Sequence, residues 1–279
     1  MKPIIAKKEV TRHILKTFDI HMSKKLGQNF LIDEAVVNNI VKSAEIIEGE
    51  TVLEIGPGIG TLTQALAEAK ANVIAVEIDN KLPQVLAKTL EGYDNIKIVH
   101  GDILKVNIRE LVEDKPFKVV ANLPYYITTP IIMGILEQGL PVTRLVTMIQ
   151  KEVADRMIAK PGKKDYGSLS VAVQYYTEPE IVALVPPKSF IPAPAVDSVV
   201  ISCKVRENPA VSVNSEKMFF RIAKGAFAQR RKTLSNSLKT TGIPFDKIKE
   251  ALENAGIDGT RRGETLSLQE FADIANNLA

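Results

Sequence analysis

The chain has 279 residues, a formal net charge of +3 and a pI near 8.7, and 45% of its residues are hydrophobic, so gross disorder is excluded. A single cysteine, Cys203, excludes a disulfide framework and a cysteine-built zinc site, and three scattered histidines argue against a metal site. No segment is apolar for long enough to span a membrane, and the first thirty residues lack a signal peptide's apolar core. We therefore expect a cytoplasmic protein without a metal.

Strand-like runs alternate with amphipathic segments over the first 150 residues. Asp33 is placed to cap a first helix, and the predicted strands are residues 51–55, 72–77, 96–99, 117–121 and 144–150. Amphipathic segments lie between them at residues 61–69, 81–90 and 131–136, with a weaker one near 108–112. This alternation predicts βαβ units and a doubly wound, mainly parallel sheet.

The pattern changes in the last third of the chain. Residues 180–185 and 197–205 are β-rich runs joined by a proline-rich link, and we expect them to pair antiparallel at the edge of the sheet. Residues 207–216 form a polar, proline-containing connector, and only helical patterns follow it. The sequence therefore predicts two domains, residues 1–206 and residues 207–279.

Positive charge is concentrated in two segments. Residues 1–25 carry a net charge of +5 and residues 217–239, which contain no acid, carry +7, so the rest of the chain carries −9. Such concentration lets a protein bind a polyanion without being basic throughout. A solvated basic helix is the alternative, but the spacing of Lys217, Arg221, Lys224 and Arg231 on one helical face favours phosphate binding. The candidate polyanion-binding residues are Lys217, Arg221, Lys224, Arg230, Arg231 and Lys232.

A glycine-rich turn follows the first predicted strand. Residues 54–61 are Glu-Ile-Gly-Pro-Gly-Ile-Gly-Thr, so Gly56 and Gly58 belong to a G-x-G-x-G pattern and not to the G-x-G-x-x-G of a dinucleotide site. Glycines here let the backbone turn sharply and approach a ligand closely. Taken alone, the turn is also typical of a tight strand-to-helix connection.

Polar residues stand at the ends of the next three strands. Glu77 ends the second strand, where an acid can accept hydrogen bonds from both ribose hydroxyls of a nucleoside. Asp102 follows the third strand and can accept from an adenine amino group, while Ile78 and Ile103 could enclose the ring. Asn122 follows the fourth strand. Because such strand ends converge on one crevice in an open α/β sheet, they predict a pocket for an adenosine-containing ligand.

These strand-end motifs resemble those of class I S-adenosylmethionine-dependent methyltransferases. From about Lys25 to about Phe271 the chain further resembles the ribosomal RNA adenine dimethyltransferase family, close to its small-subunit branch, the dimethyladenosine transferases. Tyr125 is the tyrosine of the motif at residues 122–130. The residue after it is often Asn in that family and is Tyr126 here, a departure that concerns the shape of the target-base pocket and not the chemistry. The segments that carry the resemblance are 25–31 (KLGQNFL), 122–130 (NLPYYITTP), 150–154 (QKEVA), 166–170 (YGSLS), 190–198 (FIPAPAVDS), 227–232 (FAQRRK) and 261–264 (RRGE).

The resemblance implies a Rossmann-like, doubly wound α/β sheet of the class I methyltransferase type, with an antiparallel edge hairpin and a small all-helical C-terminal domain. It implies that residues 1–206 bind S-adenosylmethionine and hold the catalytic site, and that residues 207–279 bind RNA or the ribosome. Asn29 and Leu31 enter the cofactor site on this ground alone. The full expected cofactor-binding set is Asn29, Leu31, Gly56, Gly58, Glu77, Ile78, Asp102, Ile103 and Asn122.

The expected catalytic residues follow from the poor nucleophilicity of an aromatic amine. The carboxamide oxygen of Asn122 and the main-chain oxygen of Leu123, held extended by Pro124, would accept the two N6 hydrogens and aim the lone pair at a sulfonium methyl group. Tyr125 would stack on the adenine, and Phe190 would close its other face, as the resemblance implies. No strong general base is needed, because the amine loses a proton only after it becomes cationic, so positioning carries the catalysis.

We expect a monomer that transfers two methyl groups from S-adenosylmethionine to N6 of two adjacent adenines in a 3′-terminal hairpin loop of small-subunit (16S) ribosomal RNA, during subunit biogenesis. A large-subunit (23S) enzyme of the antibiotic-resistance type is one alternative, disfavoured by the longer C-terminal region and residues 261–264. A non-catalytic, RNA-binding assembly factor is another. A nicotinamide dehydrogenase is disfavoured by the glycine spacing.

Overall fold

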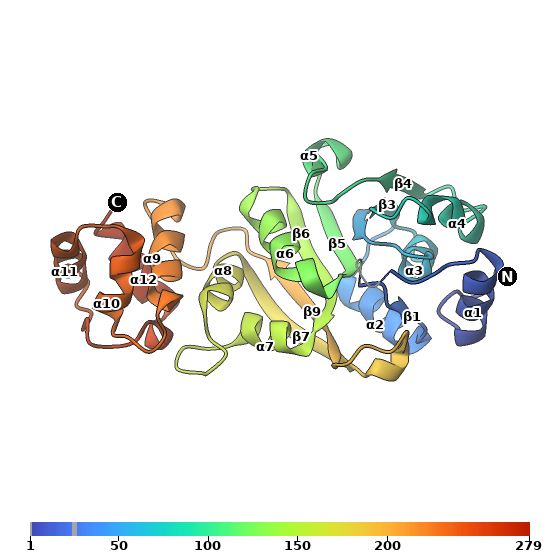
Figure 1. The fold of residues 1–279 in the computed structure, drawn as a ribbon. Helices are drawn as coiled ribbons and strands as arrows, with labels where there is room; N and C mark the ends of the chain where they lie inside the picture. Colours follow the sequence, from blue (N-terminus) through green and yellow to red (C-terminus); the bar gives the residue numbers. More distant parts are fainter. Residues whose placement is uncertain (1, 24–26) are drawn as a thin grey trace. The chain divides into compact units, whose positions relative to one another are not determined.

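The computed structural model describes residues 2–23 and 27–279, so Lys25 and Leu26 of the first family segment lie outside the described residues. The contacts within the chain form two compact units (Figure 1). The first unit contains Met1–Ala154 and Glu180–Val205, and the second contains Asp155–Pro179 and Arg206–Ala279.

A seven-stranded sheet forms the centre of the first unit, in the order β4-β3-β2-β5-β6-β9-β7. The neighbours from β4 to β6 are parallel, whereas β9 is antiparallel to β6. Strands β3 and β4 lie on one side of β2 in the sheet, whereas β5 and β6 lie on its other side. Because the strand order reverses between β2 and β5, their carboxyl ends form a topological switch point. The strands are β2 (Thr51–Ile55), β3 (Asn72–Glu77), β4 (Ile96–His100), β5 (Phe117–Asn122), β6 (Val142–Gln150), β7 (Thr177–Val185) and β9 (Ser198–Val205).

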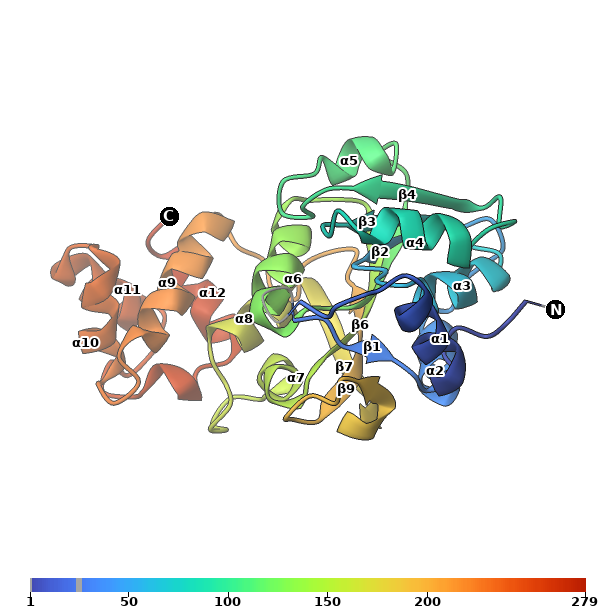
Figure 2. The ribbon, with the colours of Figure 1, turned by 45° about the vertical axis from the view of Figure 1, so that its right-hand side comes forward.

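Helices lie beside this sheet (Figure 2), and buried apolar residues join them to it. Asp33 caps α2 by accepting the main-chain N–H groups of Ala35 and Val36, as expected. Helices α2 and α3 share one hydrophobic cluster with the sheet, and α1 and α4 share another. The helices are α1 (Lys8–Thr17), α2 (Glu34–Ala44), α3 (Thr61–Glu68), α4 (Leu82–Thr89), α5 (Ile108–Leu111), α6 (Thr128–Glu137) and α7 (Lys151–Ile158), the last of which crosses into the second unit.

A small second sheet joins two segments that are far apart in the sequence. Strand β1 (Phe30–Leu31) pairs antiparallel with β8 (Phe190–Ile191), with Leu31 opposite Phe190. The N–H of Ile32 also donates to the carbonyl oxygen of Ser189 at 2.8 Å. This pairing holds residues 30–31 in place, and residues 29–31 line the same cavity as the strand ends.

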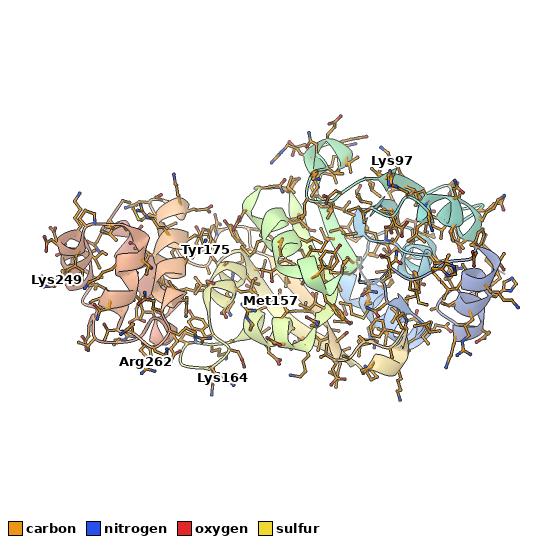
Figure 3. The ribbon with its side chains drawn as sticks, in the orientation of Figure 1. Lys97, Met157, Lys164, Tyr175, Lys249 and Arg262 are labelled. Carbon is orange, nitrogen blue, oxygen red and sulfur yellow. The ribbon has the colours of Figure 1, made fainter. Side chains whose placement is uncertain are left out.

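The second unit is helical and has its own core. Its helices are α8 (Ser168–Tyr176), α9 (Glu216–Ala228), α10 (Leu234–Leu238), α11 (Phe245–Asn254) and α12 (Leu268–Asn276). Tyr166 and Tyr175 are buried in the same cluster as Phe219 and Phe271. The side chains of Lys164, Lys249 and Arg262 are exposed around that core (Figure 3).

The expected fold class, a Rossmann-like α/β sheet, is confirmed. The sequence analysis assigned residues 155–179 to the first domain, whereas in the structure they pack with the C-terminal helices. Burial of Tyr166 and Tyr175 against α9 and α12 accounts for this difference, since that contact joins segments about 50 to 100 residues apart. The basic helix is also shorter than expected: α9 ends at Ala228, so Arg231 does not share its face.

Candidate active site

The glycine-rich turn joins β2 to α3 and leaves its backbone open on one side. Gly56 and Gly58 have φ angles of 68° and 61°, in the left-handed region that favours glycine. A Cβ atom built on Gly56 would meet no other atom within 4 Å, whereas one on Gly58 would lie 3.3 Å from the ring of Phe30. The space beside Gly56 is therefore free for a ligand, and Gly58 allows Phe30 to pack closely.

Glu77 ends β3 and binds the glycine-rich turn directly. Its carboxylate accepts the N–H of Gly58 at 3.1 Å and the N–H of Asp79 at 2.8 Å. Burial raises the pKa of Glu77 above its ordinary value, and the two main-chain donors oppose that rise. Each carboxylate oxygen can accept more than one hydrogen bond, so both remain able to accept from a ligand.

Glu54 is a second buried acid at this site, and the sequence analysis did not single it out. It is 1% exposed, and its Oε2 has no hydrogen-bond partner among the described residues. Burial raises the pKa of Glu54 to about 8, with a smaller contribution in the same direction from the charge of Glu77 and an opposing one from hydrogen bonds with Thr63. A signal was present in the sequence, because an acid within the apolar run of β2 is unusual for a buried strand.

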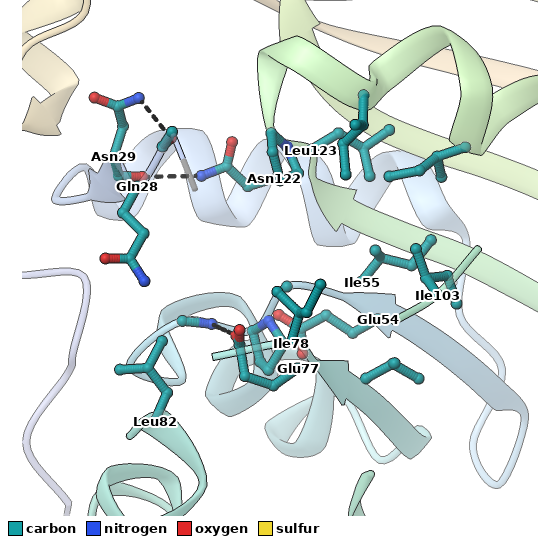
Figure 4. Close-up of a pocket in the computed structure, with 18 of the residues that line it drawn as sticks. Gln28, Asn29, Glu54, Ile55, Glu77, Ile78, Leu82, Ile103, Asn122 and Leu123 are labelled. Atoms are coloured by element: carbon teal, nitrogen blue, oxygen red, sulfur yellow. Dashed lines mark hydrogen bonds between the residues drawn. The ribbon is translucent and has the colours of Figure 1, made fainter. Parts of the chain in front are cut away.

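A cavity opens at the carboxyl ends of β2, β3, β4 and β5 (Figure 4). All the residues expected to bind the cofactor line this cavity, and so do Asn122, Leu123 and Tyr125 of the expected catalytic set. Glu54 also lines it. The convergence of strand ends that the sequence predicted is therefore present, with one extra acid.

Asn122 is held in place by the segment on the other side of the cavity. Its Nδ2 donates to the carbonyl oxygen of Asn29 at 3.2 Å, and Asn29 Nδ2 donates to the carbonyl oxygen of Gly27 at 3.0 Å (Figure 4). Because the amide nitrogen already donates to Asn29, the Asn122 Oδ1 atom can accept a hydrogen bond from a ligand. No donor in the described ranges bonds to the carbonyl oxygen of Leu123, whose own N–H donates to Met148. Two consecutive residues at the tip of β5 that line the cavity thus each have an oxygen able to accept a hydrogen bond.

The two expected aromatic partners of the target base are in different places. Tyr125 lines the cavity, and its hydroxyl is hydrogen-bonded to the Oγ of Ser198 at 2.6 Å. Phe190 is 3% exposed and belongs to the hydrophobic cluster that contains Leu31, so the structure does not bring it to the cavity. Its place in β8, opposite Leu31, accounts for this burial. Tyr126 also lines the cavity and is 54% exposed.

The residues expected to bind adenine line the cavity near the ends of β3 and β4. Asp102 accepts the N–H of Leu104 at 3.0 Å through Oδ1, which fixes its carboxylate. Ile103 is buried, whereas Ile78 is 45% exposed. The two isoleucines thus offer apolar surface next to an acceptor, as the sequence suggested.

A polar bridge that the sequence did not reveal closes one side of the cavity. Gln28 Nε2 donates to the carboxylate of Asp79 at 2.8 Å, and the Gln28 Oε1 accepts the N–H of Ser23 at 2.9 Å. This bridge joins the segment before β1 to the end of β3, across 51 residues. Residues 27–31 are thereby attached at Asp79 and at Asn122.

The basic residues of the second unit divide into two kinds. The Arg221 guanidinium donates to the carbonyl oxygen of Thr241, and Arg230 donates to the carbonyl oxygens of Lys164 and Tyr166. These two arginines therefore hold loops. In the described part of the chain, the side chains of the other candidates have no hydrogen bond or ion pair and are exposed; they are Lys217, Lys224, Arg231 and Lys232.

The described residues contain no candidate metal site and no candidate membrane-spanning helix. No group of three or more His, Cys, Asp or Glu residues in the described ranges is arranged to hold a metal ion. No helix in the part of the chain that the structure describes has the length and apolar character to cross a membrane.

Comparison with known proteins places this site in a family. The model of the ribosomal RNA adenine dimethylase family matches residues 20–279. The chain belongs to the ribosomal RNA adenine dimethylase family. The resemblance noted from the motifs is confirmed.

Relatives within the ribosomal RNA adenine dimethylase family match over nearly the whole chain. The Ribosomal RNA small subunit methyltransferase A of Clostridioides difficile is 52% identical over 95% of this chain and 94% of its own length. The protein of the same name from Alkaliphilus oremlandii is 50% identical over 99% of this chain and 98% of its own.

Solved structures agree with this family assignment. A dimethyladenosine transferase from Plasmodium falciparum has a TM-score of 0.76 at 27% identity and covers 88% of this chain and 95% of that one. The 23S rRNA methyltransferase ErmE has a TM-score of 0.68 at 28% identity, covering 89% and 99%. The two structures share the fold of this dimethylase.

Proposed function

We propose that this dimethylase transfers two methyl groups from S-adenosylmethionine to N6 of two adjacent adenines in small-subunit ribosomal RNA. The observation that carries the proposal is the pair of acceptors at the tip of β5, Asn122 Oδ1 and the Leu123 carbonyl oxygen, in one cavity with Glu77. An adenine amino group has two hydrogens to donate, so two adjacent acceptors match its chemistry.

The cavity fits the methyl donor at several points. The free space beside Gly56 accepts a ligand close to the backbone, and Glu77 presents carboxylate oxygens to ribose hydroxyls. Asp102, between Ile78 and Ile103, suits an adenine ring with its amino group. Bound there, S-adenosylmethionine supplies a methyl group activated by a positively charged sulfur.

The chain's own residues act by holding the target amine. Accepting both N6 hydrogens withdraws the lone pair from conjugation with the ring and turns it toward the cavity, which makes the nitrogen a better nucleophile. Tyr125 lies next to these acceptors and offers its ring to the base, and such stacking contributes roughly 1–3 kcal/mol per base. A loop adenine costs less to bring into this position than a paired one, since it needs less unstacking.

The choice between ribosomal subunits rests on the relatives. The relatives at 50–52% identity are named for the small subunit, whereas the similar structure of a large-subunit enzyme is 28% identical. We therefore favour the small subunit as partner, with Lys217, Lys224, Arg231 and Lys232 contacting RNA phosphates. The reaction would take place in the cytoplasm, where bacterial subunits are assembled.

The test is methyl transfer from tritiated S-adenosylmethionine to subunits isolated without this modification, followed by nucleoside analysis. We expect N6,N6-dimethyladenosine in the small-subunit RNA and no label in large subunits added as the control substrate. Label confined to the large subunit would contradict the proposal in favour of the antibiotic-resistance type. Tight binding without any label would instead support an assembly factor.

A further inference from the structure

The hydroxyl of Tyr125 is hydrogen-bonded to a buried serine from a distant part of the sequence. Tyr125 Oη and Ser198 Oγ are 2.6 Å apart, although 73 residues separate them in the chain. Ser198 is fully buried and begins β9. It lies opposite Gln150 of β6 in the antiparallel register, and the Lys151 N–H donates to the carbonyl oxygen of Asp197 at 3.0 Å. The serine is therefore fixed by the sheet itself.

The backbone of Tyr125 is fixed separately. Tyr125 begins a single 3₁₀ turn, Tyr125–Ile127, and the carbonyl oxygen of Pro124 accepts the Ile127 N–H at 3.2 Å and the Thr128 Oγ1 hydroxyl at 3.0 Å. These bonds hold the main chain but not the ring, which can still turn about its side-chain torsions. The bond to Ser198 is the contact that fixes the far end of the ring.

We propose that Ser198 is a positioning residue that sets the plane of the Tyr125 ring against the target adenine. This inference rests on the proposed function, because the ring orientation matters only if a base stacks on it. A ring held by a sheet residue keeps one orientation. The adenine that stacks on it then brings its amino group to a constant distance from Asn122 Oδ1 and the Leu123 carbonyl oxygen. The Tyr125 hydroxyl is protonated at neutral pH, and burial raises its pKa further above the ordinary value.

The experiment is a double-mutant cycle on methyl transfer with Ser198→Ala, Tyr125→Phe and both together. Each single variant removes the same hydrogen bond from one end. We expect each to lower kcat roughly tenfold, since a misplaced reactant loses its near-attack geometry. The double variant is expected to be no slower than the slower single, because the bond can be lost only once. The affinity of the Ser198→Ala variant for S-adenosylmethionine should change less than twofold, as Ser198 does not line the cavity.

Two further variants separate positioning from folding. Ser202→Ala, in the same strand, removes a buried hydroxyl that accepts from Arg144 at 3.2 Å and is the matched control, expected to keep the wild-type kcat. Ser198→Thr retains the hydroxyl and should recover part of the lost rate. Thermal unfolding of every variant identifies any that fail to fold, and Tyr125→Phe, which leaves β9 intact, then still tests the bond.

The outcomes are distinct from those for the proposed function. If the wild-type protein methylates small-subunit RNA but Ser198→Ala and Tyr125→Phe both match Ser202→Ala in kcat, the positioning role is wrong. Additive losses in the double variant would contradict it as well. If the wild-type protein transfers no methyl group, the proposed function fails before the cycle is measured.

Discussion

The side-chain amide of Asn122 donates to the main-chain oxygen of Asn29 at 3.2 Å, which joins the end of β5 to a segment 93 residues earlier. This bond determines which end of the amide faces the cavity. An amide that was free to rotate would present its nitrogen as often as its oxygen, and a donor there cannot accept an adenine hydrogen. If the proposed function is right, the segment before β1 contributes to catalysis by orienting this one side chain.

Replacing Asn122 by Asp tests this orientation. The substitution keeps an acceptor but places a second oxygen opposite the carbonyl oxygen of Asn29, where two acceptors repel. We expect the single-turnover rate of methyl transfer to fall about a hundredfold. This is the size of the rate loss that follows when one aligned polar contact to a transition state is removed. Replacing Asn38, an exposed residue of α2, by Asp is the control for added charge. A rate within twofold of the wild type would mean that the Asn29 bond does not orient the amide.

Glu77→Gln is expected to weaken the binding of S-adenosylmethionine. The substitution keeps the shape but removes the charge that strengthens hydrogen bonds from ribose hydroxyls, and such bonds contribute about 1.5–3 kcal/mol when one partner is ionised. We expect the dissociation constant to rise at least tenfold in titration calorimetry. Glu137→Gln, in the exposed end of α6, should leave it unchanged. Equal affinities for all three proteins would place the ribose elsewhere.

The buried carboxyl of Glu54 should make stability depend on pH. Its pKa of about 8 in the folded protein lies above the ordinary value of 4.5, so the folded state holds a proton that the unfolded state has lost. The stability that Glu54 contributes is therefore fully present below the unfolded-state pKa and is lost as the pH rises through the folded-state pKa. We expect the part of the free energy of unfolding that Glu54 contributes to the ligand-free protein, from urea titrations, to fall between about pH 4.5 and about pH 8.

Glu54→Gln is the matching variant, because glutamine resembles the protonated carboxyl and does not titrate. It should remove most of the pH dependence that Glu54 contributes. If the wild-type protein and this variant lost stability equally over that range, a different group would be responsible.

The exposed lysines of α9 are expected to contact RNA phosphates. Replacing Lys217 and Lys224 by Ala should weaken binding to small subunits and reduce the slope of log affinity against log salt by roughly 1 to 2, since each phosphate contact releases counterions. These two lysines are chosen because replacing Arg221 would also remove its hydrogen bond to the carbonyl oxygen of Thr241. The control is Lys247→Ala with Lys249→Ala in α11, which removes the same charge from exposed positions. The same slope in both double variants would assign the α9 lysines to solubility.

The sheet and most of the cavity could be predicted because their signals are local. Each strand from β2 to β5 is a short, largely apolar run, and each functional residue ends a strand or follows it within two residues, so chain order alone brings Gly56, Glu77, Asp102 and Asn122 together. The helix that Asp33 caps was predictable from the same kind of local pattern.

The features that the sequence did not reveal depend on contacts between distant segments. Strands β1 and β8 have two residues each, too few to show a period, so the burial of Phe190 opposite Leu31 could not be inferred. The Gln28–Asp79 bridge is a pairing of side chains with no sequence pattern of its own. Residues 155–179 gave no helix signal that assigned them to the second unit, because their partners lie in α9 and α12.

The most direct test of the account is a crystal structure of this dimethylase soaked with S-adenosylmethionine. We expect density for the donor in the cavity at the ends of β2 to β5, with its ribose at Glu77 and its methyl group facing Asn122. Density for the donor away from the tip of β5, with Asn122 still bonded to Asn29, would contradict the assignment of that asparagine to the methyl-transfer site.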